Sequence, residues 1–271
     1  MSVAPSLEGR VALVTGAGRG LGRAHAHALA AIGAAVVVND VDLGPAEEVA
    51  RELRGQGARA VADGTDVASV AGGRRAVEVA VDAFGRVDVL VNNAGFAHGG
   101  GSVGSPAEDE LDALLDVHFK AAVGTMAAAF SDMRERGWGR VINTVSEASI
   151  DARFVATLGY GAAKAALWSA TLVAADEGRP YGITVNAISP GARTRLNAAV
   201  LDRGFREGAS ANLDLDPAHV AAVVAYLASD EAADITGRVI HAAGGQVREY
   251  STTRTSHSEL VDRLRAALAA G

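Results

Sequence analysis

Short valine-rich runs alternate with longer helical patterns along most of the chain, and this alternation limits the possible folds more than any other feature. Val11–Thr15, Ala35–Asp40 and Val87–Val91 are nearly continuous apolar runs of strand length, whereas Leu21–Ile32 and Ser69–Phe84 have the composition and length of helices. Continuous apolar runs are typical of parallel strands that are covered on both faces. The pattern predicts an α/β fold, a doubly wound (Rossmann) parallel sheet of about seven strands with helices on both faces.

The alternation continues to about residue 240. The further predicted helices cover residues 45–56, 111–136, 158–176 and 217–228, and the further predicted strands cover residues 58–62, 140–145, 182–187 and a short segment that opens at 239–240. A glycine-rich stretch at 99–104 is expected to be a loop. No linker or internal repeat interrupts the pattern, which predicts a single domain over residues 1–248 and a C-terminal tail over residues 249–271.

Composition excludes several classes of function. The chain has 271 residues and a formal net charge of −7, which argues against nucleic acid as a partner. It contains no cysteine, so disulfides, thiolate nucleophiles and cysteine-ligated metals are excluded. No apolar run of membrane-spanning length and no stretch typical of a signal peptide is found, so we expect no membrane association and a cytoplasmic location.

A glycine-rich turn links the first predicted strand to the first predicted helix. It reads Gly16-Ala17-Gly18-Arg19-Gly20-Leu21-Gly22. Glycines at this place let the backbone approach a pyrophosphate, and the helix N-terminus supplies free N–H groups and a partial positive charge. Gly16, Arg19, Gly20, Leu21 and Gly22 are therefore predicted to bind a dinucleotide.

Asp40 ends the second predicted strand, eighteen residues after Gly22. A carboxylate at this place can accept hydrogen bonds from a ribose 2′-hydroxyl and repels a 2′-phosphate, which favours NAD over NADP. Arg19 argues in the opposite direction, since a cation in the glycine turn can bind that phosphate. We give Asp40 the greater weight and expect NAD, with NADP as the alternative.

Tyr160 and Lys164 lie four residues apart in a predicted helix. This spacing places the two side chains on one face. A nearby ammonium favours the phenolate form of tyrosine and lowers its pKa from about 10, so that the phenol can exchange a proton with an alcohol or a carbonyl. Taken alone the pair is a weak signal, because an amphipathic helix with a solvated lysine has the same pattern.

With these motifs in place, the chain resembles the short-chain dehydrogenase/reductase family in its shorter, single-domain branch. The matching motifs come in the family's order and cover about residues 8–246. They are Thr15-Gly-x-x-x-Gly20-x-Gly22, Asp66-Val67, Asn92-Asn93-Ala94-Gly95, Ser146, Tyr160-x-x-x-Lys164, Asn186-Ala187-Ile188-Ser189-Pro190-Gly191 and Gly244-Gly245. The resemblance implies an oxidoreductase that transfers hydride between a nicotinamide cofactor and a secondary alcohol or ketone.

The resemblance also implies a role for each matched position. For the cofactor, Asp66 and Val67 would hold the adenine, Asn93, Ala94 and Gly95 would line the cleft behind the fourth strand, and Pro190, Gly191 and Thr194 would hold the nicotinamide carboxamide. For catalysis, Ser146 would hold the substrate oxygen and Tyr160 would transfer the proton. Lys164 would bind the nicotinamide ribose and lower the pKa of Tyr160.

Two positions depart from the family pattern. Ser146 stands fourteen residues before Tyr160, one more than is usual, so Ser149 is a competing candidate; we favour Ser146 because it directly follows the strand. His118 occupies the place of an asparagine that holds a water in the family's proton relay. We consider a relay role and a structural role, bonded to backbone, equally compatible with the sequence.

The stretch Val117-His118-Phe119-Lys120 and the ending Asn39-Asp40 also resemble the dehydrogenase part of multifunctional peroxisomal β-oxidation proteins, which oxidise (3R)-hydroxyacyl-CoA thioesters. Residues 96–106, 147–157 and 192–216 would line the substrate pocket, without a decodable signature. The alternatives are an NADPH-dependent ketoreductase and a catalytically silent dinucleotide-binding protein. The family assembles through the helices after strands four and five, so we expect a homodimer or a homotetramer.

Overall fold

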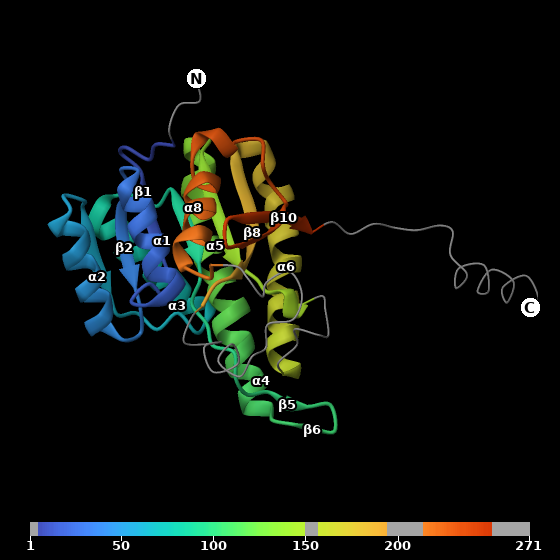
Figure 1. Cartoon of the computed structure of the whole chain (residues 1–271). Helices are drawn as coiled ribbons and strands as arrows, with labels where there is room; N and C mark the ends of the chain where they lie inside the picture. Colours follow the sequence, from blue (N-terminus) through green and yellow to red (C-terminus); the bar gives the residue numbers. More distant parts are fainter. Residues whose placement is uncertain (1–4, 150–156, 194–213, 251–271) are drawn as a thin grey trace, which may run out of the picture.

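The computed structural model describes residues 5–149, 157–193 and 214–250 (Figure 1). Among these residues, eight strands form one sheet: β1 (Val11–Val14), β2 (Ala35–Asn39), β3 (Ala60–Asp63), β4 (Val89–Asn92), β7 (Gly139–Thr144), β8 (Ile183–Gly191), β9 (Val239–Ala243) and β10 (Gln246–Tyr250). Their order across the sheet is β10-β9-β8-β7-β4-β1-β2-β3, and all neighbours are parallel except the pair β9–β10. The predicted α/β fold is confirmed.

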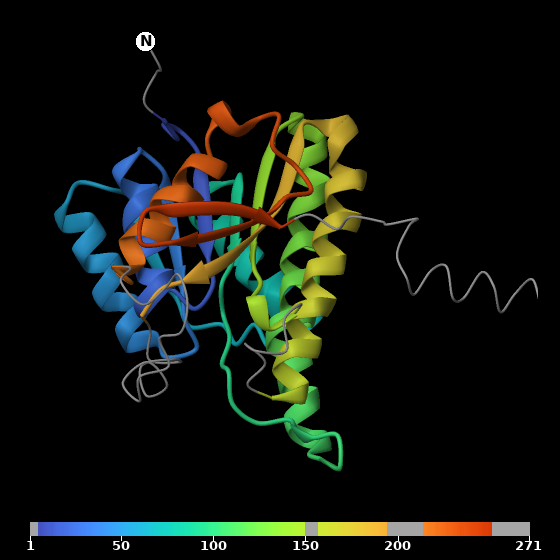
Figure 2. The ribbon, with the colours of Figure 1, turned by 45° about the vertical axis from the view of Figure 1, so that its right-hand side comes forward.

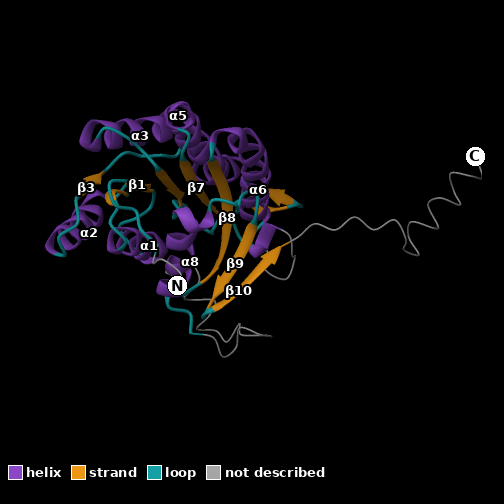
Figure 3. Cartoon of the chain, turned by 90° about the horizontal axis from the view of Figure 1, so that it is seen from above, coloured by secondary structure: helices purple, strands orange, loops and turns teal. Residues whose placement is uncertain are grey.

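Helices cover both faces of the sheet, as Figure 3 shows from above. One face carries α1 (Gly20–Ala31), α2 (Leu43–Gly55) and α8 (Pro217–Leu227), and the other carries α3 (Val70–Phe84), α5 (Ala121–Arg136) and α6 (Leu158–Gly178). Each face has its own core of aliphatic side chains. Because the parallel strands are buried on both sides, they are rich in valine, leucine, isoleucine and alanine and show no regular polar alternation.

The segment predicted as one helix over 111–136 is continuous but not uniform. It begins as α4 (Glu108–Leu115), passes through a π-helical turn at Asp116–Lys120, and continues as α5. Among the described residues this is the one stretch, Glu108–Arg136, that is long and apolar enough to cross a membrane, and half of its apolar window is buried inside the protein. A helix that forms part of a core has the same properties.

The order of the strands reverses at the centre of the sheet. From β1 the chain moves outward through β2 and β3, and it then returns to β4 on the other side of β1 and moves outward again. The carboxyl ends of β1 and β4 therefore lie side by side while their following segments diverge. In open α/β sheets this is the place where ligands bind.

Two elements were not predicted. β10 turns back from β9 as an antiparallel edge strand, so that Glu249 and Tyr250, the first residues of the predicted tail, are paired in the sheet. The stretch expected to be a loop contains a small hairpin of β5 (Gly101–Ser102) and β6 (Ser105–Pro106), which projects from the body beside α4 (Figures 1 and 2). Gly100 packs against the first turn of α6. A Cβ added to Gly100 would lie 2.9 Å from the backbone nitrogen of Gly159.

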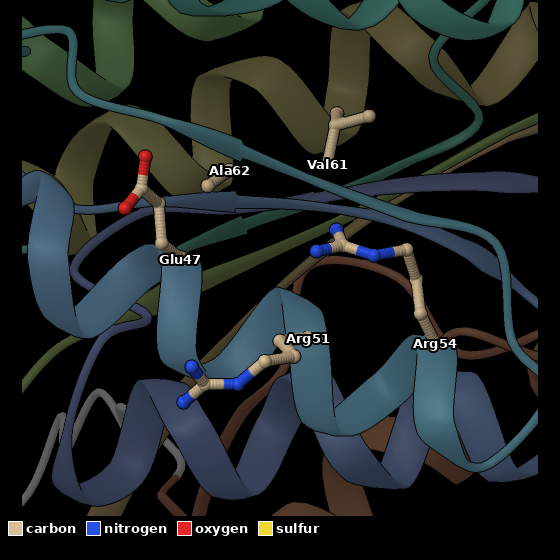
Figure 4. Close-up of a pocket in the computed structure, with 5 residues that line it drawn as sticks. All are labelled: Glu47, Arg51, Arg54, Val61 and Ala62. Atoms are coloured by element: carbon tan, nitrogen blue, oxygen red, sulfur yellow. The ribbon is translucent and has the colours of Figure 1, made fainter.

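The opposite edge of the sheet is formed by β3 and is protected by charge. A shallow pocket of about 420 Å³ lies between β3 and α2, and its lining includes Glu47, Arg51 and Arg54 from the helix (Figure 4). Arg54 donates a hydrogen bond to the carbonyl of Ala60 at 2.9 Å. Long charged side chains beside an edge strand oppose the pairing of that strand with another chain. We therefore assign the charged residues of this pocket to protection of the β3 edge.

Candidate active site

The glycine turn lies at the point where the strand order reverses. Gly16 has a left-handed backbone (φ 62°), and a Cβ there would lie 2.8 Å from the Cα of Ala94. At Gly22 a Cβ would lie 2.2 Å from the carbonyl oxygen of Gly16. Any larger residue at these positions would push the turn, the helix and the segment after β4 apart. The glycines therefore keep the turn folded tightly beneath the start of α1.

The N-terminus of α1 is suited to an anion. Arg19 is its N-cap residue and makes no side-chain capping hydrogen bond. The first N–H groups of the helix thus remain available, and they carry the positive end of the helix dipole. A tight glycine turn below an uncapped helix N-terminus fits the pyrophosphate of a dinucleotide.

Acidic side chains surround the turn on the side of β2. Asp40 accepts hydrogen bonds from the backbone N–H groups of Gly18 (3.0 Å) and Asp42 (3.0 Å), and a Cβ at Gly18 would lie 2.8 Å from its carboxylate. Arg19 donates to Asp42 at 2.6 Å, and this hydrogen bond raises the pKa of the Arg19 guanidinium. The sequence analysis did not identify Asp42, although this residue binds Arg19, the cation that favoured NADP.

The segment after β4 is fastened to the turn by Asn93 and Thr15. The Asn93 side chain donates to the carbonyls of Thr15 (3.0 Å) and Gly16 (3.1 Å). In return the Thr15 hydroxyl accepts from the backbone N–H groups of Asn93 (3.0 Å) and Ala94 (3.1 Å). The predicted wall of the cleft is therefore joined directly to the predicted phosphate turn.

The two residues that are predicted to hold the adenine follow the end of β3. Asp66 is exposed and accepts from the backbone N–H of Ala68 at 2.9 Å, whereas Val67 is buried. On the other flank of the sheet, Pro190 and Gly191 end β8 and pair with Ala242 and Ala243 of β9. Thr194 lies outside the described residues.

Ser146 lies two residues after the end of β7, at the strand end that its predicted role requires. Its hydroxyl accepts from the N–H of Ala148 at 3.2 Å, and its interaction with the Tyr160 phenol favours a lower pKa of that phenol. The competing Ser149 instead donates its hydroxyl to the backbone carbonyl of Ser146 at 2.6 Å. This geometry favours Ser146 over Ser149 as the partner of the phenol.

Tyr160 stands in the first turn of α6, whose N-cap Thr157 accepts from the Tyr160 N–H at 3.3 Å. Burial raises the pKa of the Tyr160 phenol, and the hydrogen bond from Ser146 acts in the opposite direction. The lowered pKa expected from the sequence is not found in this structure. The reason is geometric, because the ammonium of Lys164 lies 5.8 Å from the centroid of the Tyr160 ring and is directed elsewhere.

Lys164 is buried and donates to the backbone carbonyl of Thr144 at 2.5 Å. Burial lowers the pKa of Lys164 to about 7. The group therefore changes its charge near neutral pH, which suits a residue that takes part in proton transfer. Thr144 is the last residue of β7, so the strand that carries Ser146 also positions Lys164.

His118 packs against Tyr160 in the π-helical turn, with ring centroids 5.4 Å apart and planes at 82°. Its Nε2 lies 2.7 Å from the carbonyl of Phe96 and must donate to it. Nδ1 is then an acceptor, and it is buried without a hydrogen-bond partner among the described residues. Burial lowers the pKa of His118 to about 2, so the ring is neutral. The ring bonds to backbone, as a structural role requires, and also keeps a buried acceptor that has no partner among the described residues.

Gly95 makes room for this histidine. A Cβ at Gly95 would lie 2.0 Å from Cε1 of His118, closer than packing permits. Behind the catalytic residues, a buried chain of hydrogen bonds leads from Thr125 to Asn92 (2.7 Å), from Asn92 to Asn143 (2.9 Å) and from Asn143 to Thr171 (3.0 Å). This network joins α5, β4, β7 and α6 below the site. Sequence reasoning did not find it, because its members have no common spacing.

The fold and this arrangement define a class of protein, an oxidoreductase that uses a nicotinamide dinucleotide. Residues 10–202 match the family model described as short chain dehydrogenase, and the chain belongs to the short-chain dehydrogenase/reductase family. It is similar to the crystal structure of a short-chain dehydrogenase from Mycobacterium avium, with a TM-score of 0.82 and 38% identity over 97% of this chain and 95% of that one.

Two relatives are similar along the sequence. A putative short-chain type dehydrogenase/reductase of Mycobacterium tuberculosis is 38% identical, over 91% of this chain and 86% of its own length. A hydroxyacyl-CoA dehydrogenase of the same organism is 36% identical, over 89% of this chain and 79% of its own length.

The third relative is the peroxisomal multifunctional enzyme type 2 of Drosophila melanogaster. It is 38% identical over 91% of this chain, and the matched region covers 41% of the Drosophila protein. The resemblance to the dehydrogenase part of such proteins is thus confirmed as a distant one.

Proposed function

We propose that the chain is an NAD-dependent dehydrogenase of 3-hydroxyacyl-CoA thioesters, with Tyr160 as its acid/base. One observation carries the chemistry: Ser146, Tyr160 and Lys164 converge at the carboxyl end of β7, next to the tight glycine turn below α1. The thioester is favoured because a hydroxyacyl-CoA dehydrogenase is among the relatives that match most of the chain.

In this proposal each side chain has a separate task. When bound, the dinucleotide accepts or donates the hydride at its nicotinamide ring. Ser146 holds the substrate oxygen with its hydroxyl, whose position is fixed by the N–H of Ala148. Tyr160 removes the hydroxyl proton during oxidation and returns it during reduction. Lys164 titrates near neutral pH and stabilises the phenolate when it is protonated.

His118 would complete this set as an acceptor for a water molecule. Its Nδ1 is buried without a hydrogen-bond partner among the described residues, its ring packs against Tyr160, and its neutral state leaves the lone pair free. A water held there would extend a proton relay behind Lys164, which is one of the two roles that the sequence left open for this position.

NAD is favoured over NADP by two carboxylates. Asp40 faces the glycine turn through Gly18, and Asp42 engages Arg19, the cation that could bind a 2′-phosphate. An NADPH-dependent ketoreductase would need Arg19 to leave Asp42. A catalytically silent binder would not need Ser146 beside the Tyr160 phenol or the buried amine of Lys164.

The test is NADH formation from NAD with a panel of 3-hydroxyacyl-CoA thioesters, hydroxysteroids and simple secondary alcohols. Tyr160→Phe is expected to lower kcat by about 10²-fold or more while NADH still binds. Tyr181→Phe, which alters an exposed tyrosine of the Arg179–Tyr181 turn, is the matched control and should keep full activity.

Faster turnover of a simple alcohol than of any thioester would reject the substrate class. Equal turnover by wild type and Tyr160→Phe would reject the mechanism.

A further inference from the structure

Next to Ser146, a cluster of polar and aromatic side chains remains outside the mechanism given above. It consists of Glu147, which follows the serine, His241 of β9, Tyr250 of β10 and Trp168 of α6. None of them has a role in the proposed chemistry, yet they come from four separate elements that meet at one place.

The cluster is held together by the last residue of the last strand. The Tyr250 hydroxyl donates a short hydrogen bond to the Glu147 carboxylate. The Tyr250 ring packs between Trp168, at a centroid distance of 6.0 Å, and His241, at 6.2 Å. His241 Nδ1 lies 3.9 Å from the same Glu147 oxygen. A partly buried aromatic ring with its hydroxyl on a carboxylate fixes both partners in one orientation.

Each partner of Tyr250 is adjacent to a part of the catalytic site. Glu147 opens the Glu147–Ser149 turn, and this turn also fixes the Ser146 hydroxyl through Ala148. Trp168 is one helical turn beyond Lys164 on α6. His241 packs on the nicotinamide segment, since a Cβ at Gly191 would lie 3.3 Å from its Cε1. A displacement of Tyr250 would therefore loosen all three at once.

We propose that Tyr250 and Glu147 are positioning residues, whose hydrogen bond holds the turn that presents Ser146 to the substrate oxygen and to Tyr160. This inference rests on the catalytic role proposed for Ser146. It assigns a function to β10, which closes the sheet beyond β9 and ends on the carboxylate beside the catalytic serine.

The hydrogen bond is tested by substitutions that remove its donor or its acceptor separately. Tyr250→Phe keeps the ring and removes the donor, Glu147→Ala removes the acceptor, and Glu147→Gln keeps an acceptor oxygen. We expect Tyr250→Phe and Glu147→Ala each to lower kcat by about tenfold with an unchanged KM for NAD, as a small misplacement of a reacting group does. The double variant should lose no more than either single one, because both remove the same interaction. Glu147→Gln should keep most of the activity.

Two further readouts separate positioning from a general loss of stability. When Ser146 is displaced, the hydrogen bond that lowers the pKa of Tyr160 weakens, so the pH at which kcat reaches its plateau should move upward in Tyr250→Phe. Tyr226→Phe is the matched control, since this hydroxyl on α8 also donates to the protein, to the carbonyl of Glu231 at 3.4 Å, but away from the site. Its kcat and pH profile should remain those of wild type.

Crystal structures of wild type and Tyr250→Phe decide the matter independently of any substrate. The expected result is a displaced Glu147–Ser149 turn and a longer distance between the Ser146 and Tyr160 oxygens. An unchanged turn, or wild-type kcat in Tyr250→Phe while Ser146→Ala is inactive, would overturn the inference. If Ser146→Ala and Tyr160→Phe themselves kept full activity, the proposed function would fail instead.

Discussion

At the scale of single residues, the balance of charge around Arg19 decides what its guanidinium can bind. The side chain lies at the mouth of the glycine turn, where it could contact a 2′-phosphate. Asp42 holds it at 2.6 Å, while Asp40 is occupied by two backbone N–H groups. We therefore propose that cofactor preference depends on two carboxylates with different tasks, since one shapes the turn and the other engages the cation.

Asp42→Ala is expected to release Arg19 and to shift the preference toward NADP. The kcat/KM for NADP should rise by about tenfold, the size of effect that a single charge-assisted hydrogen bond produces, while that for NAD changes little. Asp40→Ala should behave differently, because it also removes the acceptor for Gly18 and should weaken both cofactors. Steady-state kinetics with each nucleotide measures these ratios. An unchanged ratio in Asp42→Ala would mean that Arg19 does not face the 2′-position.

At the scale of elements, the first turn of α6 sets the position of the Tyr160 phenol, which we propose as the acid/base. Thr157 caps the helix by accepting from the backbone N–H of Tyr160 itself at 3.3 Å. Ser69 caps α3 in the same way, accepting from Gly72 at 2.9 Å. The two caps are chemically alike, and only one of them adjoins the reacting residue.

Thr157→Ala and Ser69→Ala should therefore differ in activity rather than in stability. Each is expected to lower the free energy of unfolding by about 1 kcal/mol, the usual cost of an N-cap. Only Thr157→Ala should also lower kcat, by about threefold, because fraying of the first turn of α6 moves Tyr160. Urea unfolding and kcat at saturating cofactor provide the two measurements. Equal kcat values in both variants would show that the cap does not position the phenol.

Which elements could be predicted depended on the strength of their sequence pattern. The parallel strands were predictable because they are buried on both faces and are nearly continuous apolar runs, as in Ala35–Asn39. β10 was missed because Gln246–Tyr250 is a mostly exposed edge strand of polar residues. The π-helical turn at Asp116–Lys120 was missed because one inserted residue does not change the helical composition. It nevertheless decides where His118 points.

The site was predictable to the extent that its residues follow strand ends. Gly16, Asp40, Asn93 and Ser146 each lie within two residues of a strand end, so parallel topology brings them together at one edge of the sheet. Contacts between distant loops had no such signal. Asp42 on Arg19 and Tyr250 on Glu147 depend on side-chain reach in three dimensions.

At the scale of the whole molecule, buried histidines make the stability depend on pH. His25 in α1 is fully buried, and neither ring nitrogen has a hydrogen-bond partner among the described residues. Burial lowers its pKa to about 4, and that of His118 to about 2, from the value of 6.5. Below pH 6.5 these histidines bind protons in the unfolded chain but not in the folded protein. Their contribution to stability is therefore fully present above that pH and is lost as the pH falls toward 4.

His25→Leu should reduce this dependence. The slope of the free energy of unfolding between pH 6 and 4 is expected to fall by up to about 1.4 kcal/mol per pH unit, the contribution of one titrating group. At pH 7.5, where the imidazole is neutral in both states, the variant should be at least as stable as wild type, because it removes a buried polar group without a partner. Urea unfolding across this pH range measures both. An unchanged slope would mean that His25 is protonated in the folded protein.

The outer faces of α5 and α6 form a surface that a second copy of the chain could cover. A groove of about 900 Å³ lies between the two helices and is lined largely by apolar side chains, among them Phe119, Met126, Phe130 and Val173. Arg134 and Glu177 form an ion pair at its rim, at 3.5 Å. A patch that carries both charges and an apolar centre can pair with itself about a twofold axis. We therefore propose a homodimer through these helices, as the family resemblance implied.

Val173→Asp should dissociate this dimer. Val173 is 57% exposed in the single chain, so a carboxylate there costs little in the monomer but would be buried without a partner in the dimer. Val81→Asp is the matched control, because Val81 is 41% exposed on α3, outside the groove. Light scattering after size exclusion should give half the wild-type mass for Val173→Asp and an unchanged mass for Val81→Asp. A wild-type mass for Val173→Asp would exclude the α5–α6 surface as the interface. Since α6 also carries Tyr160 and Lys164, any loss of kcat in a Val173→Asp monomer that remains folded would further indicate that assembly helps to hold the catalytic helix.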